Sequence, residues 1–145
     1  MTRIVIITRV LLSAVAISLA GGAASAQTPK GFDIKVLGSI DLGPEIDGMA
    51  GRVLRMSYVT VAPGGELAAH SHDGRPEIIY VLQGILTEAR NGGPAVDHKP
   101  GDVLIMKTGV THALSNRSAE PAIYRVIAAL PASVRGKVRT RSCAP

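Results

Sequence analysis

Apolar and polar residues alternate in short runs between residues 34 and 130, and a period of two residues predicts β-strands. Glycine- and proline-rich turns at residues 63–65, 91–93 and 100–101 separate these runs. Short strands with turn signals about every eight to twelve residues are typical of an all-β sandwich or barrel. We therefore expect strands at residues 34–40, 52–61, 66–72, 77–82, 85–90, 103–106, 111–114 and 122–130.

The same alternation predicts which residues face the core. If Glu77 faces inward, then Ile79 and Val81 also face inward. Their neighbours Ile78, Tyr80 and Leu82 then face outward. This outer face is too apolar for open solvent. We expect it to pack either on the N-terminal arm or on a second subunit of a homodimer.

The first 26 residues predict a secretory signal peptide rather than part of the fold. Arg3 and Arg9 give a basic start, residues 10–20 are apolar, and Ala24 and Ala26 match a small-residue cleavage site. The apolar run is too short to span a bilayer comfortably. We expect cleavage between Ala26 and Gln27, a periplasmic or secreted protein, and no stable membrane insertion after cleavage.

The remaining 119 residues suffice for one domain. We divide them into an N-terminal arm (27–50), a β-barrel (51–130) and a basic C-terminal tail (131–145). The mature chain has 14 basic and 11 acidic residues, and four of the bases lie after residue 134. The barrel itself is therefore nearly neutral, which argues against a nucleic-acid partner. Cys143 stands alone, so the sequence predicts no intramolecular disulfide.

Three histidines and one glutamate have a spacing that predicts a metal site. His70 and His72 are two residues apart, so a strand would direct both imidazoles to one face. A turn at residues 73–76 then lets Glu77 face the same way, and His112 arrives from a later strand. Imidazole and carboxylate together suit one divalent transition metal such as Fe, Mn, Ni, Cu or Zn.

These residues lie in two stretches that resemble the paired motifs of the cupin superfamily. One departure is Lys107, where members of the family usually carry proline. The resemblance implies a compact, single cupin barrel, also called a double-stranded β-helix or jelly roll, with His70, His72, Glu77 and His112 as metal ligands. The positions that carry it are Gly64, His70, His72, Glu77, Gly84, Gly101, Gly109, His112 and Asn116.

Other polar residues have weaker assignments. Asn116 either caps a turn or makes a hydrogen bond to a metal ligand. His98 precedes the turn at Pro100 and is interpreted as a surface residue. Catalytic residues are not identified, because the strand phase does not show which of four further residues face the cavity: Arg55, Tyr58, Tyr124 and Arg125.

The resemblance implies several chemistries, because many proteins with this ligand set are dioxygenases, decarboxylases, lyases or isomerases. We expect a metalloenzyme that acts on a small organic substrate, with dioxygenase-like chemistry favoured, since no second carboxylate can be placed as a general base. One alternative is a metal-dependent isomerase, lyase or decarboxylase acting on a sugar acid or keto acid. Another is a non-catalytic protein of the cell envelope that binds a metal or a small molecule.

Overall fold

The computed structural model describes residues 29–134, and this part of the chain is all-β apart from one short 3-10 helix. The predicted signal peptide and most of the predicted basic tail, including Cys143, lie outside the described residues. The elements are β1 (Lys30–Asp41), β2 (Arg52–Ser71), β3 (Glu77–Gln83), β4 (Leu86–Arg90), β5 (Ala95–His98), β6 (Val103–Met106), β7 (Thr111–Ser115), β8 (Ala122–Pro131) and η1 (Ala132–Val134).

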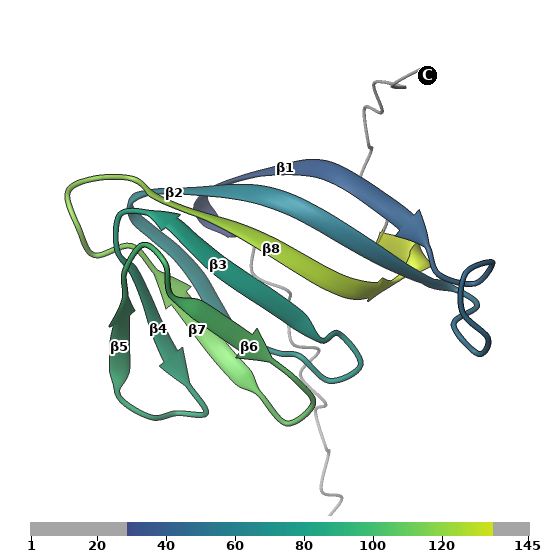
Figure 1. Cartoon of the computed structure of the whole chain (residues 1–145). Helices are drawn as coiled ribbons and strands as arrows, with labels where there is room; N and C mark the ends of the chain where they lie inside the picture. The colour runs from purple at the N-terminus through teal and green to yellow at the C-terminus, as the bar shows by residue number, and fades with distance from the viewer. Residues whose placement is uncertain (1–28, 135–145) are drawn as a thin grey trace, which may run out of the picture.

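The strands form one curled antiparallel sheet with the order β5-β4-β7-β2-β8-β3-β6, and β1 pairs with β2. Strand β2 joins the two halves, because residues 52–61 pair with β8 whereas residues 66–71 pair with β7. Figure 1 shows the long strands β1, β2 and β8 side by side, with the short strands β4, β5, β6 and β7 beneath them. The predicted cupin barrel, or jelly roll, is confirmed.

Most of the predicted strands are present, with three differences. The two runs at residues 52–61 and 66–72 form the single strand β2, although Gly64 within it has a positive φ of 68°. The strand predicted at residues 34–40 extends over Lys30–Asp41 and pairs with β2, so the N-terminal arm supplies an edge strand. Strand β5 was not expected, because its residues lie between the turn signals at 91–93 and 100–101.

The core lies inside the curl, where alternate residues of facing strands meet. Val59 and Val61 of β2, Ile79 and Val81 of β3, and Leu114 of β7 are all buried there. A tight chain approach beside this core requires glycine at position 84, because a Cβ there would collide with the carbonyl oxygen of Pro121. Within residues 29–134, no helix is long and apolar enough to cross a membrane.

The outer face of strands β2, β8, β3 and β6 carries a row of apolar side chains. Met56 of β2 lies opposite Ile127 of β8, Ile127 lies opposite Ile78 of β3, and Ile78 lies opposite Ile105 of β6. All four side chains are exposed, and Ile105 is the most exposed at 58%. Of the predicted outer residues, Ile78 belongs to this row, and within the described residues the row has no covering element.

Candidate metal centre

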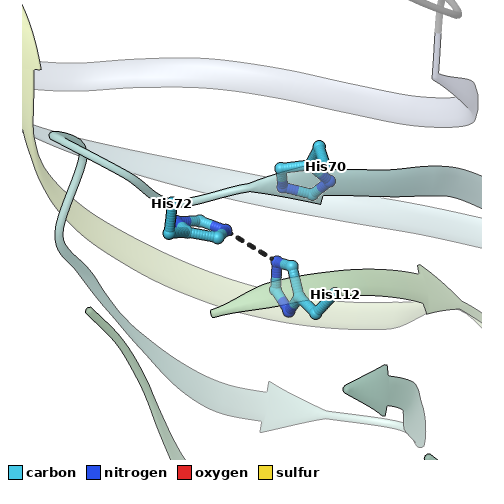
Figure 2. A group of neighbouring side chains, drawn as sticks. All are labelled: His70, His72 and His112. Carbon is cyan, nitrogen blue, oxygen red and sulfur yellow. Dashed lines mark hydrogen bonds between the residues drawn. The ribbon is translucent and has the colours of Figure 1, made fainter. Parts of the chain in front are cut away.

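The three histidines of the two motifs converge at one end of the barrel. His70 lies in β2 directly opposite His112 of β7, and His72 follows at the end of β2, where its backbone N–H donates to the carbonyl of Val110. One ligand nitrogen from each ring can be chosen so that all three lie within 4.8 Å of one another. Figure 2 shows the rings pointing toward a common space, with His72 and His112 fully buried.

Hydrogen bonds at the Nδ1 atoms of His72 and His112 determine which ring nitrogen is free to bind a metal. The Nδ1 atom of His112 lies 2.8 Å from a carboxylate oxygen of Glu88, and Nδ1 of His72 lies 3.2 Å from the carbonyl oxygen of Arg75. A carboxylate and a carbonyl oxygen only accept, so each Nδ1 carries the proton. The Nε2 atoms of both rings therefore hold lone pairs.

His70 follows the same rule. Its Nδ1 atom lies 3.0 Å from the carbonyl oxygen of Ala68, which again leaves the lone pair on Nε2. Its ring centroid lies 4.7 Å from that of His112 and 5.0 Å from that of His72. The Nδ1 atoms of all three rings thus contact acceptor oxygens, and one nitrogen of each ring lies within 4.8 Å of the others, an arrangement that can hold a metal ion.

The distance between the ring nitrogens supports a cation at this point. Nε2 of His72 lies 2.9 Å from Nε2 of His112, the contact drawn dashed in Figure 2. In the tautomers assigned above neither atom carries a proton, so the two lone pairs repel each other unless a cation lies beside both. Ligands at right angles about 2.1 Å from a metal lie about 3.0 Å apart, which matches this distance. The histidines therefore fit a metal ion.

Glu77, the fourth predicted ligand, lies beside His72 but outside the cluster of the three histidines. It is the first residue of β3, and its Oε1 atom lies 3.9 Å from Nε2 of His72. The ligand atoms of the three histidines lie within 4.8 Å of one another, and Glu77 is not part of this group. Burial raises the pKa of Glu77 to about 7, against the opposing influence of the Arg75 and Arg55 guanidinium groups. Its role as a ligand stays a prediction.

The electrostatics of the histidines favour metal binding at neutral pH. Burial lowers the pKa of His112 to about 4, although its hydrogen bond to Glu88 acts in the opposite direction. Burial likewise lowers the pKa of His72, and the hydrogen bond to the Arg75 carbonyl opposes this shift. Both rings are neutral near pH 7, so little free energy is needed to remove protons before a metal binds.

A buried carboxylate in β4, Glu88, was missed by the sequence analysis. Its side chain is 5% exposed, and it contacts His112, Arg90 and His98. The alternation of Leu86, Glu88 and Arg90 within the predicted strand was the available signal. Only the pairing of β4 with β7 shows that this face is the one that carries His112.

The side chain of Asn116 stabilises the turn that follows β7 and makes no hydrogen bond to the three histidines among the described residues. Its amide nitrogen donates to the backbone carbonyls of Val61 and Glu120, and its side-chain oxygen accepts from the backbone and hydroxyl of Ser118. These bonds use both donor hydrogens and both lone pairs of the amide. Of the two alternatives that the sequence left open, the geometry supports the turn cap and gives Asn116 no bond to a metal ligand among the described residues.

The surface assignment of His98 was wrong. Its side chain is only 19% exposed, and its buried Nε2 atom lies 3.3 Å from Oε2 of Glu88. This contact is electrostatic rather than a well-aligned hydrogen bond. The reason is the register of β5, which pairs His98 with Leu86 and brings its ring over the Glu88 side chain. His98 is still outside the cluster of the three convergent histidines.

The strand register also resolves the four other polar candidates. Tyr124 is buried and faces inward, whereas Arg125 is exposed and lies opposite Tyr58 on the outer face. Arg55 lies opposite Ala128, which in turn lies opposite Glu77, so Arg55 belongs to the inner face on the side of the metal centre.

A groove of about 630 Å³ lies over strands β4 and β7, on the face of the sheet opposite the histidines. Thr87, Ala89, Ala113 and Ser115 line it together with residues 64–68 of β2, and none of the three histidines does. These four residues alternate with inward-facing ones, so the groove opens on the outer face of β4 and β7. It does not give access to the metal centre.

Comparison with known proteins agrees with this geometry. Residues 57–128 match the family model described as a cupin domain. Germin-like protein 1-1 of Oryza sativa subsp. japonica is 33% identical over 85 residues, which are 56% of this chain and 38% of that protein. The chain thus spans well under half the length of this relative.

Several solved structures share the fold. The polyketide cyclase RemF of Streptomyces resistomycificus superimposes with a TM-score of 0.56 at 22% identity, covering 70% of this chain and 66% of that one. A Cupin 2 conserved barrel domain protein of Salinispora arenicola CNS-205 gives 0.53 at 21% identity, covering 80% of this chain and 89% of that one. At such identities the likeness extends to the fold alone.

Proposed function

Because this chain belongs to the cupin superfamily, we propose that it is a metalloenzyme that acts on a small organic substrate, with dioxygenase-like chemistry favoured. The observation that carries the proposal is the convergence of one ring nitrogen from each of three histidines, with the Nε2 atoms of His72 and His112 2.9 Å apart. We propose His70, His72, His112 and Glu77 as ligands of one divalent transition metal, namely Fe, Mn, Ni, Cu or Zn.

The residues around the site would hold the metal and limit its contact with water. A bound metal would supply Lewis-acid chemistry and, if redox-active, the activation of dioxygen. His72 and His112 are buried, and Met106, which lies opposite Glu77 in the ladder, is 1% exposed. These three side chains are therefore shielded from water, which suits a small ligand.

The state of Glu88 supports the preference for oxygen-dependent chemistry. It is a carboxylate next to the site, but its oxygens already bind Arg90 and His112. A general base needs a free oxygen within reach of the substrate proton. Glu88 is 5% exposed and both of its oxygens are in contact with neighbouring side chains, so it is poorly placed as a general base, and the proposed chemistry relies on the metal.

The experiment that tests the proposal starts with the metal content of the purified protein. Oxygen uptake is then measured with a panel of phenols, diketones and thiols, with the His112→Ala variant as a matched control. Uptake with a redox-active metal, lost in the variant, supports the dioxygenase-like function. Zinc, or no metal, without turnover of any substrate supports instead a non-catalytic binding protein of the cell envelope.

The position of Glu77 favours a second candidate, a metal-dependent isomerase, lyase or decarboxylase acting on a sugar acid or keto acid. Its Oε1 atom lies 3.9 Å from the nearest ligand nitrogen, and its pKa is raised to about 7 by burial. A carboxyl with a pKa near the working pH is suited to general acid–base catalysis. In this function the three histidines hold the metal and Glu77 moves the proton.

The variant Glu77→Gln separates the two roles. A ligand role predicts that the variant loses metal affinity, because the amide is a poorer metal ligand than the carboxylate. An acid–base role predicts that the variant keeps its metal and loses turnover. The metal content is measured by elemental analysis after dialysis, with the exposed Glu66→Gln as a control that should change neither property.

Export from the cytoplasm and self-association belong to the same proposal. The sequence of residues 1–26 supports export to the periplasm or beyond, so the metal would be acquired outside the cytoplasm. The exposed row of Met56, Ile127, Ile78 and Ile105 supports a homodimer, because two apolar sheet faces can pack on each other.

A further inference from the structure

Glu88 connects the metal centre to the neighbouring strands. Its Oε1 atom accepts a hydrogen bond of 2.8 Å from Nδ1 of His112, and its Oε2 atom faces His98 of β5 at 3.3 Å. We propose that Glu88 is a positioning residue that makes His112 offer Nε2 to the metal, and that Arg90 and His98 hold its carboxylate in place. This inference rests on the proposed metal site.

The chemical reason lies in the two tautomers of a neutral imidazole. A carboxylate cannot donate, so the contact with Glu88 requires the proton of His112 on Nδ1. The other tautomer would direct an N–H group at the Nε2 atom of His72, 2.9 Å away, and no lone pair would face the metal. A negative partner at Nδ1 also makes Nε2 a stronger electron donor.

The network around Glu88 is built to keep a charge inside the protein. Arg90 is two residues further along β4, so its side chain lies on the same face. Its Nε atom donates to Oε1 at 3.1 Å, and its Nη2 atom donates to Oε1 at 3.0 Å and to Oε2 at 3.2 Å. These charge-assisted bonds compensate for the loss of water around a carboxylate that is 5% exposed.

The two carboxylate oxygens of Glu88 have different partners. Oε1 serves His112 and Arg90, whereas Oε2 serves Arg90 and His98. Because three strands, β7, β4 and β5, contribute to the network, the orientation of the His112 ring depends on their register. A purely structural ion pair between Glu88 and Arg90 would not require either histidine.

The test begins with metal-free protein. NMR of isotope-labelled histidine reports which ring nitrogen of His112 carries the proton. We expect the proton on Nδ1 in the native protein and a mixture of tautomers, or a shift to Nε2, in Glu88→Gln. A ring proton that stays on Nδ1 in Glu88→Gln as in the native protein would overturn the inference. Since no metal is added, this measurement is independent of the proposed function.

Affinity for Zn²⁺, measured by competition with a chelating indicator, is the second readout. We expect Glu88→Gln to bind Zn²⁺ about 10–100-fold more weakly, which is the usual effect of removing such a partner. His98→Gln, which removes a contact only from Oε2 of Glu88, should weaken Zn²⁺ binding by a smaller factor. The exposed Glu66→Gln is the matched control and should bind as the native protein does. An affinity of Glu88→Gln equal to that of this control would overturn the inference.

A variant that misfolds is recognised by circular dichroism, and Arg90→Lys then takes its place. The lysine keeps a positive charge but cannot form the forked contact, so Glu88 stays and only its orientation is loosened. We expect Arg90→Lys to weaken Zn²⁺ binding less than Glu88→Gln does but more than Glu66→Gln does. Binding equal to that of Glu66→Gln would overturn the proposal that Arg90 holds the Glu88 carboxylate in place. If the native protein binds no metal at all, the proposed function fails while the tautomer result still stands.

Discussion

His70 lies directly opposite His112 in the antiparallel ladder between β2 and β7. This pairing joins two motifs that are 42 residues apart in the sequence. Directly opposed residues of an antiparallel pair project from the same face of the sheet. The strand register therefore brings together the two rings, and His72, at the end of β2, completes the cluster.

Removing one ligand should strip the metal without unfolding the barrel. We expect His72→Ala and His112→Ala to lose most of their bound metal after dialysis, because the remaining histidines cannot complete a site. Circular dichroism should still show the β fold, since the apolar core lies between other residues. His98→Ala should retain its metal, because His98 contacts Glu88 and no ligand atom. Equal metal loss in His98→Ala and His112→Ala would contradict the assignment.

The raised pKa of Glu77 predicts that metal-free protein loses stability as the pH rises. A carboxyl whose pKa is about 7 when folded and near 4.5 when unfolded binds more protons in the folded state between these values. Replacing it by a neutral amide removes this effect. Glu77→Gln should therefore raise the free energy of unfolding at about pH 8 by about 1–3 kcal/mol.

Urea denaturation with a chelator present, at about pH 5 and about pH 8, measures this difference. The two proteins should differ clearly at the higher pH and much less at the lower one. If Glu77→Gln were less stable than the native protein at the higher pH, the buried carboxylate would instead be stabilised by partners such as Arg55 or Arg75.

Export predicts a shortened mature chain. Mass spectrometry of protein recovered from the cell envelope should show an N-terminus close to Gln27, because a signal peptidase cleaves after small residues such as Ala24 and Ala26. The full-length chain expressed without an export pathway is the control and should retain residues 1–26. Soluble mature protein that still begins at Met1 would contradict the prediction.

The basic tail should be dispensable for the fold and the metal. Deletion of residues 136–145 should leave metal content and thermal stability unchanged, because terminal segments usually make few buried contacts. The deletion retains Val134, whose carbonyl accepts a hydrogen bond of 2.9 Å from Arg55. Loss of soluble folded protein would show that the tail packs on the barrel. Deletion from residue 132 is a useful comparison, because it removes this bond as well.

The apolar outer row predicts self-association. Ile105→Lys should shift the protein from dimer to monomer in analytical ultracentrifugation, because it places a charge in a face that would otherwise be buried. Val96→Lys is the matched control, since Val96 is 52% exposed but lies on β5, away from the row. A native protein that is already monomeric, or a control that dissociates equally, would contradict the homodimer.

The sequence alone determined the all-β fold and the identity of the clustered histidines. Alternation with a period of two is a local property, so strands and their inward faces follow from neighbouring residues. The spacing of His70 and His72 likewise places both rings on one face without knowledge of the partner strands. These features were predicted because they depend on contacts between residues that are close in sequence.

Only the tertiary structure decided what surrounds the histidines. Glu88 and His98 look like ordinary strand residues until the register of β4 between β5 and β7 brings them to His112. Asn116 could have reached inward, but the chain path offers its amide four closer backbone and hydroxyl partners. Register is set by the packing of whole strands, and a shift of one residue would turn Glu88 away from His112.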